Sequence, residues 1–123
     1  MNRTQNLKQK NYKKGLISES LAAWYLRLKG YTILARRYKT PVGEIDIIAK
    51  KGTMTIFAEV KARDSDKKGL EAITANAQRR ISRAAKYYFM AQKRHESDRQ
   101  SYRFDVIVIS GWSLSHLQNA WQV

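Results

Sequence analysis

Two apolar segments joined by a short turn constrain the fold of this chain more than any other feature. Residues 44–50 and 53–63 are rich in apolar side chains and meet at Lys51-Gly52, a pattern that predicts a tight β-hairpin. Successive side chains of a strand point to opposite faces of its sheet. One face of the hairpin is therefore entirely apolar: Ile45, Ile47, Ala49, Ile56, Ala58 and Val60. We expect this face to be core.

Acidic and basic side chains share the opposite face of the hairpin. With the turn placed as above, Asp46 lies diagonal to Glu59, with Cα atoms about 7–8 Å apart, and Lys61 follows Glu59 on the same face. Mg²⁺ takes oxygen ligands and keeps several waters, so one or two carboxylates suffice to hold it. A nearby ammonium can neutralise charge that develops on a phosphate. The pattern predicts a phosphodiesterase site that uses Mg²⁺ or Mn²⁺, with a solvated face of weak ion pairs as the alternative.

The remaining segments predict two helices and three further strands. Apolar side chains recur at helical spacing within residues 15–29 and again within residues 74–94. The inward-facing positions are Ile17, Leu21, Trp24 and Leu28 in the first helix and Ile81, Ala85, Tyr88 and Phe89 in the second. Strands are expected at 31–39, 103–110 and 112–117. The order α-β-β-β-α-β-β predicts one α/β domain in which helices flank a mixed central sheet.

The charge of the chain predicts a polyanionic partner. Its 123 residues include 24 Lys and Arg but only 10 Asp and Glu, which gives a net charge of +14. Such an excess favours a nucleic acid or, less often, an anionic membrane surface, and a structural RNA-binding protein would fit the same charge. We expect DNA as the partner, with RNA as the alternative. Residues 1–14 carry five cations and no acid. We therefore expect a flexible basic arm ahead of a domain formed by residues 15–123.

Composition excludes several other classes of protein. The absence of cysteine removes disulfides, thiolate catalysis and cysteine-based metal sites. The apolar runs are too short for a membrane-spanning helix, and no apolar segment typical of a secretory signal follows the N-terminus. We expect a cytoplasmic protein that has no membrane partner. The sequence leaves open whether it forms a homodimer.

Basic side chains on the second helix and in the arm are candidate phosphate contacts. Arg79, Arg83 and Lys86 are spaced i, i+4, i+7 and form one stripe on the helix. Lys13 and Lys14 lie at the end of the arm. These five residues are the predicted nucleic-acid contacts, and a solvated basic face is the alternative for the stripe.

Three other polar residues are candidates for a role at the site. Glu19 has only small or apolar residues at positions i±3 and i±4, so it can reach a metal held by the sheet, and a favourable helix-dipole contact is its alternative role. Asp105 lies inside a strand, where pairing with Arg103 is favoured over an accessory role at the site. Gln78 opens the basic helix and is an accessory candidate.

Four short motifs together resemble a known family. They are Gly15…Ser18-Glu19…Ala22-Ala23, Gly43-Glu44-Ile45-Asp46-Ile47-Ile48-Ala49, Glu59-Val60-Lys61 and Arg103-Phe104-Asp105-Val106. In this order and spacing they resemble the YraN-type endonuclease-like family of bacteria. That family is similar to the archaeal Holliday-junction resolvases, within the PD-(D/E)xK, restriction-endonuclease-like superfamily. The resemblance covers roughly residues 12–121.

The resemblance implies a restriction-endonuclease-like domain and assigns roles to four residues. Asp46 and Glu59 would be metal ligands, and Lys61 would be the catalytic lysine. Glu19 would be a catalytic acid carried by the first helix, and Ile45 stands where the superfamily has proline. The expected function is a Mg²⁺- or Mn²⁺-dependent deoxyribonuclease that acts on branched or recombining DNA. The alternative is a nucleic-acid-binding module that keeps this fold and cleaves nothing.

Overall fold

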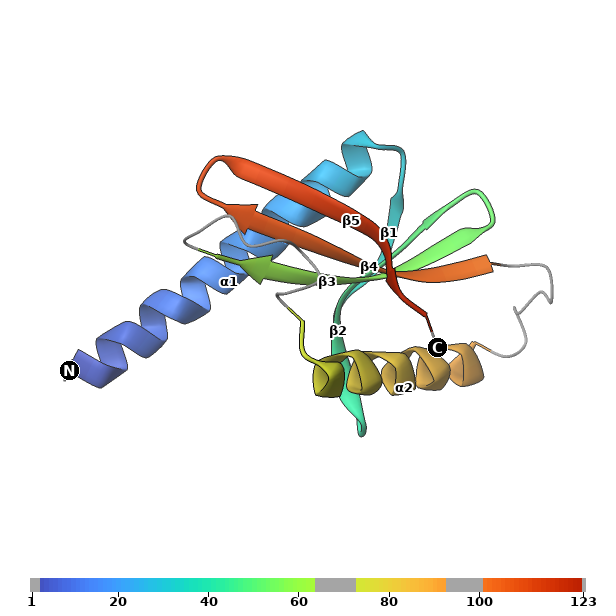
Figure 1. Ribbon diagram of the computed structural model, residues 1–123, viewed down its shortest axis with the longest axis horizontal. Coiled ribbons are helices and arrows are strands. Elements are labelled where there is room, and N and C mark those ends of the chain that lie inside the picture. The colour runs from blue at the N-terminus through green and yellow to red at the C-terminus, as the bar shows by residue number, and fades with distance from the viewer. Residues whose placement is uncertain (1–2, 64–72, 93–100, 123) are drawn as a thin grey trace.

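The computed structural model describes residues 3–63, 73–92 and 101–122, which form one mixed α/β domain (Figure 1). Its elements, in chain order, are α1 (Arg3–Leu28), β1 (Thr32–Thr40), β2 (Gly43–Lys51), β3 (Met54–Ala62), α2 (Ala75–Ala91), β4 (Ser101–Ser110) and β5 (Ser113–Trp121). The predicted order α-β-β-β-α-β-β is confirmed. Neither described helix is long and apolar enough to cross a membrane.

The five strands form one mixed sheet in the order β1-β2-β3-β4-β5. All neighbours are antiparallel except β3 and β4, which are parallel. A parallel pair needs a crossover connection, and α2 lies in the segment that makes it. In Figure 1, α1 runs behind the strands and its N-terminal end extends beyond them, whereas α2 lies below them.

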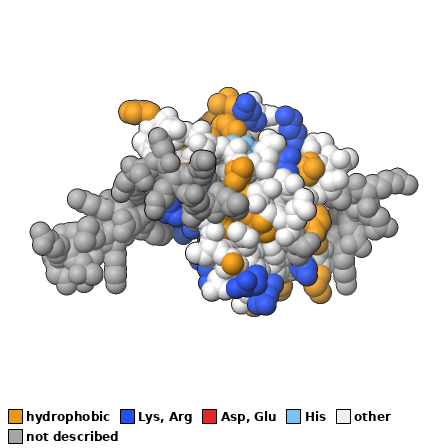
Figure 2. Space-filling view, viewed as in Figure 1, with side chains coloured by type: hydrophobic (Ala, Val, Ile, Leu, Met, Phe, Trp, Pro, Cys, Tyr) orange, Lys and Arg blue, Asp and Glu red, His pale blue; other side chains and the backbone are white. Residues whose placement is uncertain are grey.

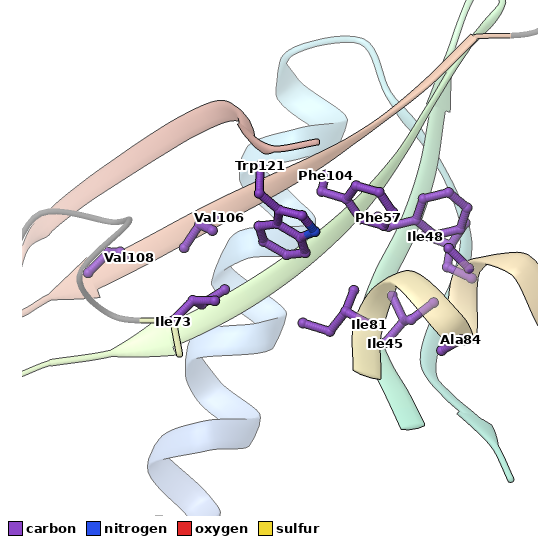
Figure 3. Close-up of a cluster of buried hydrophobic side chains, with 11 residues drawn as sticks. Ile45, Ile48, Phe57, Ile73, Ile81, Ala84, Phe104, Val106, Val108 and Trp121 are labelled. Atoms are coloured by element: carbon purple, nitrogen blue, oxygen red, sulfur yellow. The ribbon is translucent and has the colours of Figure 1, made fainter. Parts of the chain in front are cut away.

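Two apolar cores cover the two faces of the sheet. The first lies under α2, where Phe57 and Phe104 of the sheet meet Ile81 of the helix, and the indole of Trp121 stacks on Phe104 with ring centroids 5.0 Å apart (Figure 3). The second lies under α1 and joins small and apolar helix residues to the sheet: Ala22, Ala23, Leu26, Ile47, Ala49, Ile56, Ala58, Ile107 and Ile109. The domain therefore has three layers, with the sheet in the middle.

The hairpin of β2 and β3 has a different register from the one predicted. Lys51 pairs with Met54, so the turn is formed by Gly52 and Thr53, one residue later than expected. Gly52 has a φ of 61°, in the left-handed region that glycine adopts without strain, and this places it inside the turn. The pairing shifts by two residues in total. Because the side-chain period of a strand is two, each face keeps its residues.

The faces of the hairpin differ from expectation in one residue and in what covers them. Ile47 and Ala58 lie on the α1 side as predicted, but Ile45 joins the core under α2. The alternation of β2 is therefore broken around Asp46, where the ladder with β3 ends. The face that was expected to carry the acids and the lysine is also core, because Ile48 and Phe57 pack under α2.

The first helix was predicted with the wrong start and the wrong buried face. Helix α1 begins at Arg3. Residues 3–14, which were expected to form a flexible arm, therefore belong to the helix. Whether this segment moves against the domain stays a prediction. The four apolar positions expected in the core are all exposed: Ile17, Leu21, Trp24 and Leu28. The opposite face is buried because Ala22 and Ala23 let the helix approach the sheet closely.

Candidate metal and nucleic-acid site

Asp46 and Glu59 come together at the point where β2 and β3 separate. The last pair of the ladder is Ile47 with Ala58. Beyond it, the Asp46 side chain lies between the strands, and its Oδ2 accepts a hydrogen bond of 2.8 Å from the backbone N–H of Val60. The Glu59 carboxyl hydrogen-bonds with the Asp46 carboxyl. The two acids are therefore in direct contact.

Burial and the neighbouring acid change the protonation of Glu59. Desolvation, followed by the hydrogen bond and the charge of Asp46, raises the pKa of Glu59 to about 9. The charge of Lys61 and the backbone N–H of Val60 act in the opposite direction but do not outweigh burial. Glu59 therefore keeps its proton at neutral pH. A perturbed acid of this kind marks a candidate functional site.

Glu19 reaches the same place from α1. Its side chain is buried, and its Oε1 atom has no hydrogen-bond partner among the described residues, although the Nε of Arg36 lies 3.4 Å away. Burial and then the charge of Asp46 raise the pKa of Glu19, while Arg36 and Arg37 lower it. Two elements far apart in the sequence thus bring a third acid next to Asp46.

Two hollows flank Asp46, one next to α1 and the other next to α2. The first has a volume of about 280 Å³ and is lined by Gly15, Leu16, Glu19, Arg37, Glu44, Asp46 and Val60. The second has a volume of about 340 Å³ and is lined by Glu44, Asp46, Glu59, Ala77, Arg80 and Ile81. Lys61 lines neither hollow, but its positive charge is near enough to Glu59 to lower the pKa of that carboxyl. We call the three acids Glu19, Asp46 and Glu59 the acidic cluster.

Sequence reasoning missed four charged residues around the acidic cluster. They are Arg36, Arg37, Glu44 and Arg80. Glu44 precedes Asp46 by two positions, so strand periodicity could have placed it near the site. The close approach of Gly43 to α2 places Arg80, since a Cβ on Gly43 would lie 2.9 Å from the Arg80 carbonyl oxygen. No sequence pattern indicated Arg36 and Arg37 of β1, because only the pairing of β1 with β2 brings that strand beside Asp46.

The acidic cluster fits a hard divalent cation. Among the described residues, no three Asp, Glu, His or Cys side chains stand close enough together to enclose an ion by themselves. Mg²⁺ and ions like it need only one or two carboxylates and keep water in the remaining positions. Asp46 and Glu59 supply two carboxyl groups, and the Oε1 of Glu19 is buried without a hydrogen bond from the described residues. A cation here would replace the proton of Glu59.

A basic hollow lies on another side of α2. It has a volume of about 280 Å³ and is lined by Ala75, Gln78, Arg79, Ser82, Arg83, Lys86, Trp121 and Gln122. The predicted basic stripe therefore forms one wall, and Gln78 lies here instead of beside the acidic cluster. Figure 2 shows Lys and Arg side chains at the lower edge of the molecule, where Figure 1 places α2. The side chains of Lys13 and Lys14 lie outside the description.

Asp105 belongs to a separate buried cluster. Its carboxylate is fully buried and pairs with Arg103 at 2.9 Å, as predicted, and with the Nε2 of His116 at 2.7 Å. The backbone N–H of Asn119 donates a third contact, and Tyr25 hydrogen-bonds the Nδ1 of His116. Burial alone would raise the pKa of Asp105, but the hydrogen bonds from His116, Arg103 and Asn119 lower it overall. These contacts tie α1, β4 and β5 together.

Comparisons with known proteins identify the family. The model of a family described as "Uncharacterised protein family UPF0102" matches residues 18–109. A UPF0102 protein of Rhizobium etli strain CIAT 652 is 43% identical over 104 residues, which cover 85% of this chain and 84% of the relative. A UPF0102 protein of Mesorhizobium japonicum is 44% identical over 115 residues, or 93% and 90% of the two chains. One of Bartonella bacilliformis is 42% identical over 109 residues, or 89% and 88%. The chain belongs to the UPF0102 family, the YraN-type family that its motifs indicate.

Proposed function

We propose that this protein is a divalent-metal-dependent nuclease that hydrolyses phosphodiester bonds in DNA, with branched or recombining DNA as its substrate. The observation that carries the proposal is the acidic cluster. Asp46 and Glu59 touch at an open end of the sheet, Glu19 approaches from α1 with a buried oxygen that has no hydrogen-bond partner among the described residues, and cationic side chains surround all three.

The positions of the residues support a role for each of them in this proposal. Asp46 and Glu59 would hold Mg²⁺ or Mn²⁺. When bound, the ion acidifies a water molecule and polarises the phosphate. Lys61 is close enough to Glu59 to lower its pKa, so its ammonium can neutralise charge that develops on the phosphate. Glu19 borders the hollow beside Asp46, where its carboxylate can orient water or accept a proton.

The basic hollow would hold the rest of the substrate. Arg79, Arg83 and Lys86 are all exposed and line one wall of it. Arg80, on the same helix, lines the hollow at the acidic cluster. Helix α2 therefore presents cations to both hollows, so a nucleic acid can place one phosphate at the acids and its neighbours along the helix. The net charge of +14 supports such a contact.

Cleavage assays with a matched pair of lysine variants test this proposal. The substrates are duplex, single-stranded, flap and four-way-junction DNA and the corresponding RNA, each with Mg²⁺, with Mn²⁺ and with EDTA. Lys61→Ala should bind DNA nearly as well as wild type but cleave about 10²–10³ times more slowly. Lys39→Ala, an exposed lysine on β1, is the control and should cleave normally.

The second candidate function is binding without cleavage, which the basic hollow favours. In that case the wild-type protein binds DNA, none of the substrates is cut with either metal, and Lys61→Ala behaves like wild type. Arg83→Ala should then weaken binding in the same way that it would in a nuclease. This result would replace the nuclease proposal.

A further inference from the structure

The outer face of α1 carries large apolar side chains on which no other described helix or strand packs, although the guanidinium of Arg27 lies over the Trp24 ring, 5.5 Å from its centroid. The exposed fractions are 60% for Ile17, 49% for Leu21, 62% for Trp24 and 84% for Leu28. These four residues, which we call the α1 stripe, lie on the side of the helix opposite to the one that packs on the sheet. A contiguous apolar stripe of this kind marks an interaction surface.

The spacing of the α1 stripe suits a second copy of the same helix. Its residues follow one another at intervals of four, three and four, the period of a coiled-coil seam. This order of intervals reads the same in both directions, as a self-complementary two-fold contact requires. We propose that two copies of the chain pair through antiparallel α1 helices. Ile17 then meets Leu28 of the second copy, and Leu21 meets its Trp24.

The area of the α1 stripe is sufficient for a weak dimer. A whole large aromatic side chain buries about 150–250 Å², and on that scale the exposed fractions amount to roughly 400–600 Å² for each copy. The pair would bury roughly 800–1,200 Å² in total, the range of weak and transient complexes. The dimer should therefore form in a concentration-dependent way instead of being permanent.

The acidic cluster stays open in such a dimer. Glu19 lies on the inner side of α1, against the sheet, and the α1 stripe lies on the outer side. In the antiparallel pair the two Glu19 residues are seven residues apart along the helix axis, or about 10 Å. Helix axes in contact are about 8–10 Å apart. The two sites would thus lie on opposite sides of the helix pair, and both would remain accessible.

The effect of salt on binding distinguishes a second copy of the chain from other partners that could cover the α1 stripe. Two chains of +14 each repel one another, so added salt should strengthen the dimer by screening this repulsion. An anionic membrane or an acidic partner helix would bind more weakly as salt rises. The sign of the salt dependence therefore tells these occupants apart.

Analytical ultracentrifugation of the full chain tests the proposal. Samples from about 1 μM to about 1 mM, in about 0.1 M and about 1 M salt, should shift from monomer to dimer, at lower concentration in the higher salt. Trp24→Glu should stay monomeric throughout. Trp112→Glu makes the same change at a fully exposed tryptophan of the β4–β5 turn and should dimerise like wild type.

Cross-linking tests the antiparallel register, since the chain has no cysteine of its own. A mixture of Ile17→Cys and Leu28→Cys chains should form a disulfide-linked dimer. Each variant alone should not, because equivalent residues would lie about 16 Å apart along the axis and a disulfide needs Cα atoms within about 7 Å.

Three outcomes would overturn the dimer: a monomer at every concentration, equal behaviour of the Trp24 and Trp112 variants, or self-linking of each single-cysteine variant. Cosedimentation of a monomer with anionic phosphatidylserine vesicles at low salt, lost in Trp24→Glu, would overturn it in favour of a membrane surface.

Discussion

The protein contains two sites where acids lose contact with water, and the fold treats them in opposite ways. Asp105 is fully buried, yet Arg103, His116 and a backbone N–H all donate to it, and its pKa is lowered. In the acidic cluster, Glu59 is desolvated beside another acid, and its pKa is raised to about 9. Asp105 and Glu59 both lie in strands of the sheet, and both suffer desolvation. What distinguishes them is the supply of hydrogen-bond donors.

This difference separates a structural acid from a candidate binding site. A buried carboxylate surrounded by donors gains nothing from a further cation, because its oxygens are already satisfied. Carboxyl groups that touch each other and keep a proton remain ready to exchange it for a metal ion. The cations near the acidic cluster offset this only in part, since Arg36 forms an ion pair of 3.4 Å with Glu19 and lowers its pKa, yet the pKa of Glu19 is raised overall.

The largest expected effect comes from removing one charge from each group. Asp105→Asn should lower the free energy of unfolding by about 3–5 kcal/mol, because it leaves the half-buried Arg103 and the His116 ring without their charged partner. Asp46→Asn makes the same change in the acidic cluster. Without metal it should alter stability by less than about 1 kcal/mol, since the Asn side-chain oxygen can still accept from the Val60 N–H and the protonated Glu59 needs no charged partner. Denaturant unfolding at neutral pH measures the free energy of unfolding of both variants. Equal losses of stability would show that Asp105 and the acidic cluster do not differ in this way.

A second effect, smaller for each unit of pH, is the pH dependence of the metal-free protein. The raised pKa of Glu59 means that its contribution to stability is complete below its ordinary pKa of 4.5 and is lost as the pH rises towards about 9. The slope is at most about 1.4 kcal/mol per pH unit. Asp105, whose pKa is lowered, contributes with the opposite sign, and its contribution is lost as the pH falls.

Glu59→Gln isolates this effect. The glutamine cannot ionise, so unfolding measured in EDTA between pH 5 and pH 9 (about the interval between the two pKa values) should show a flatter loss of stability than wild type. Added Mg²⁺ should flatten the wild-type curve as well and leave the variant unchanged. An identical slope in both proteins would mean that Glu59 ionises normally.

The sequence was sufficient to predict the acids but not their surroundings. Asp46 and Glu59 could be predicted to lie close together because a register error of two residues keeps the side-chain period, but the break in alternation that sends Ile45 to the α2 side could not. Glu19 could be recognised because no local cation explains it. The roles of Arg36 and Arg80 depend on how β1 and α2 pack against the hairpin, which no local pattern specifies.

The wrong face of α1 has a related cause. Helical periodicity finds the face with the largest apolar side chains, here Leu21 and Trp24. Packing on a sheet instead selects the face that approaches closely, and Ala22 and Ala23 provide it. The element order could be predicted because helix and strand periods differ clearly along the chain. The sequence could not predict which of the two apolar faces of α1 packs on the sheet, since both faces follow the same helical period.

The smallest expected effect concerns the contact that brings α2 to the acidic cluster. A methyl group on Gly43 would lie 2.9 Å from the backbone carbonyl oxygen of Arg80, so Gly43→Ala must push the helix away. We expect a loss of about 1–3 kcal/mol, the usual effect of overpacking. Gly15→Ala is the matched control on the other side of Asp46. Nothing lies within 4 Å of its added methyl group, so alanine should stabilise α1 by about 0.5–1 kcal/mol. Thermal unfolding of both variants measures the difference. If Arg80 serves the acidic cluster, Gly43→Ala should also weaken metal-dependent DNA cleavage, whereas equal stability and activity in the two variants would show that the contact does not position α2.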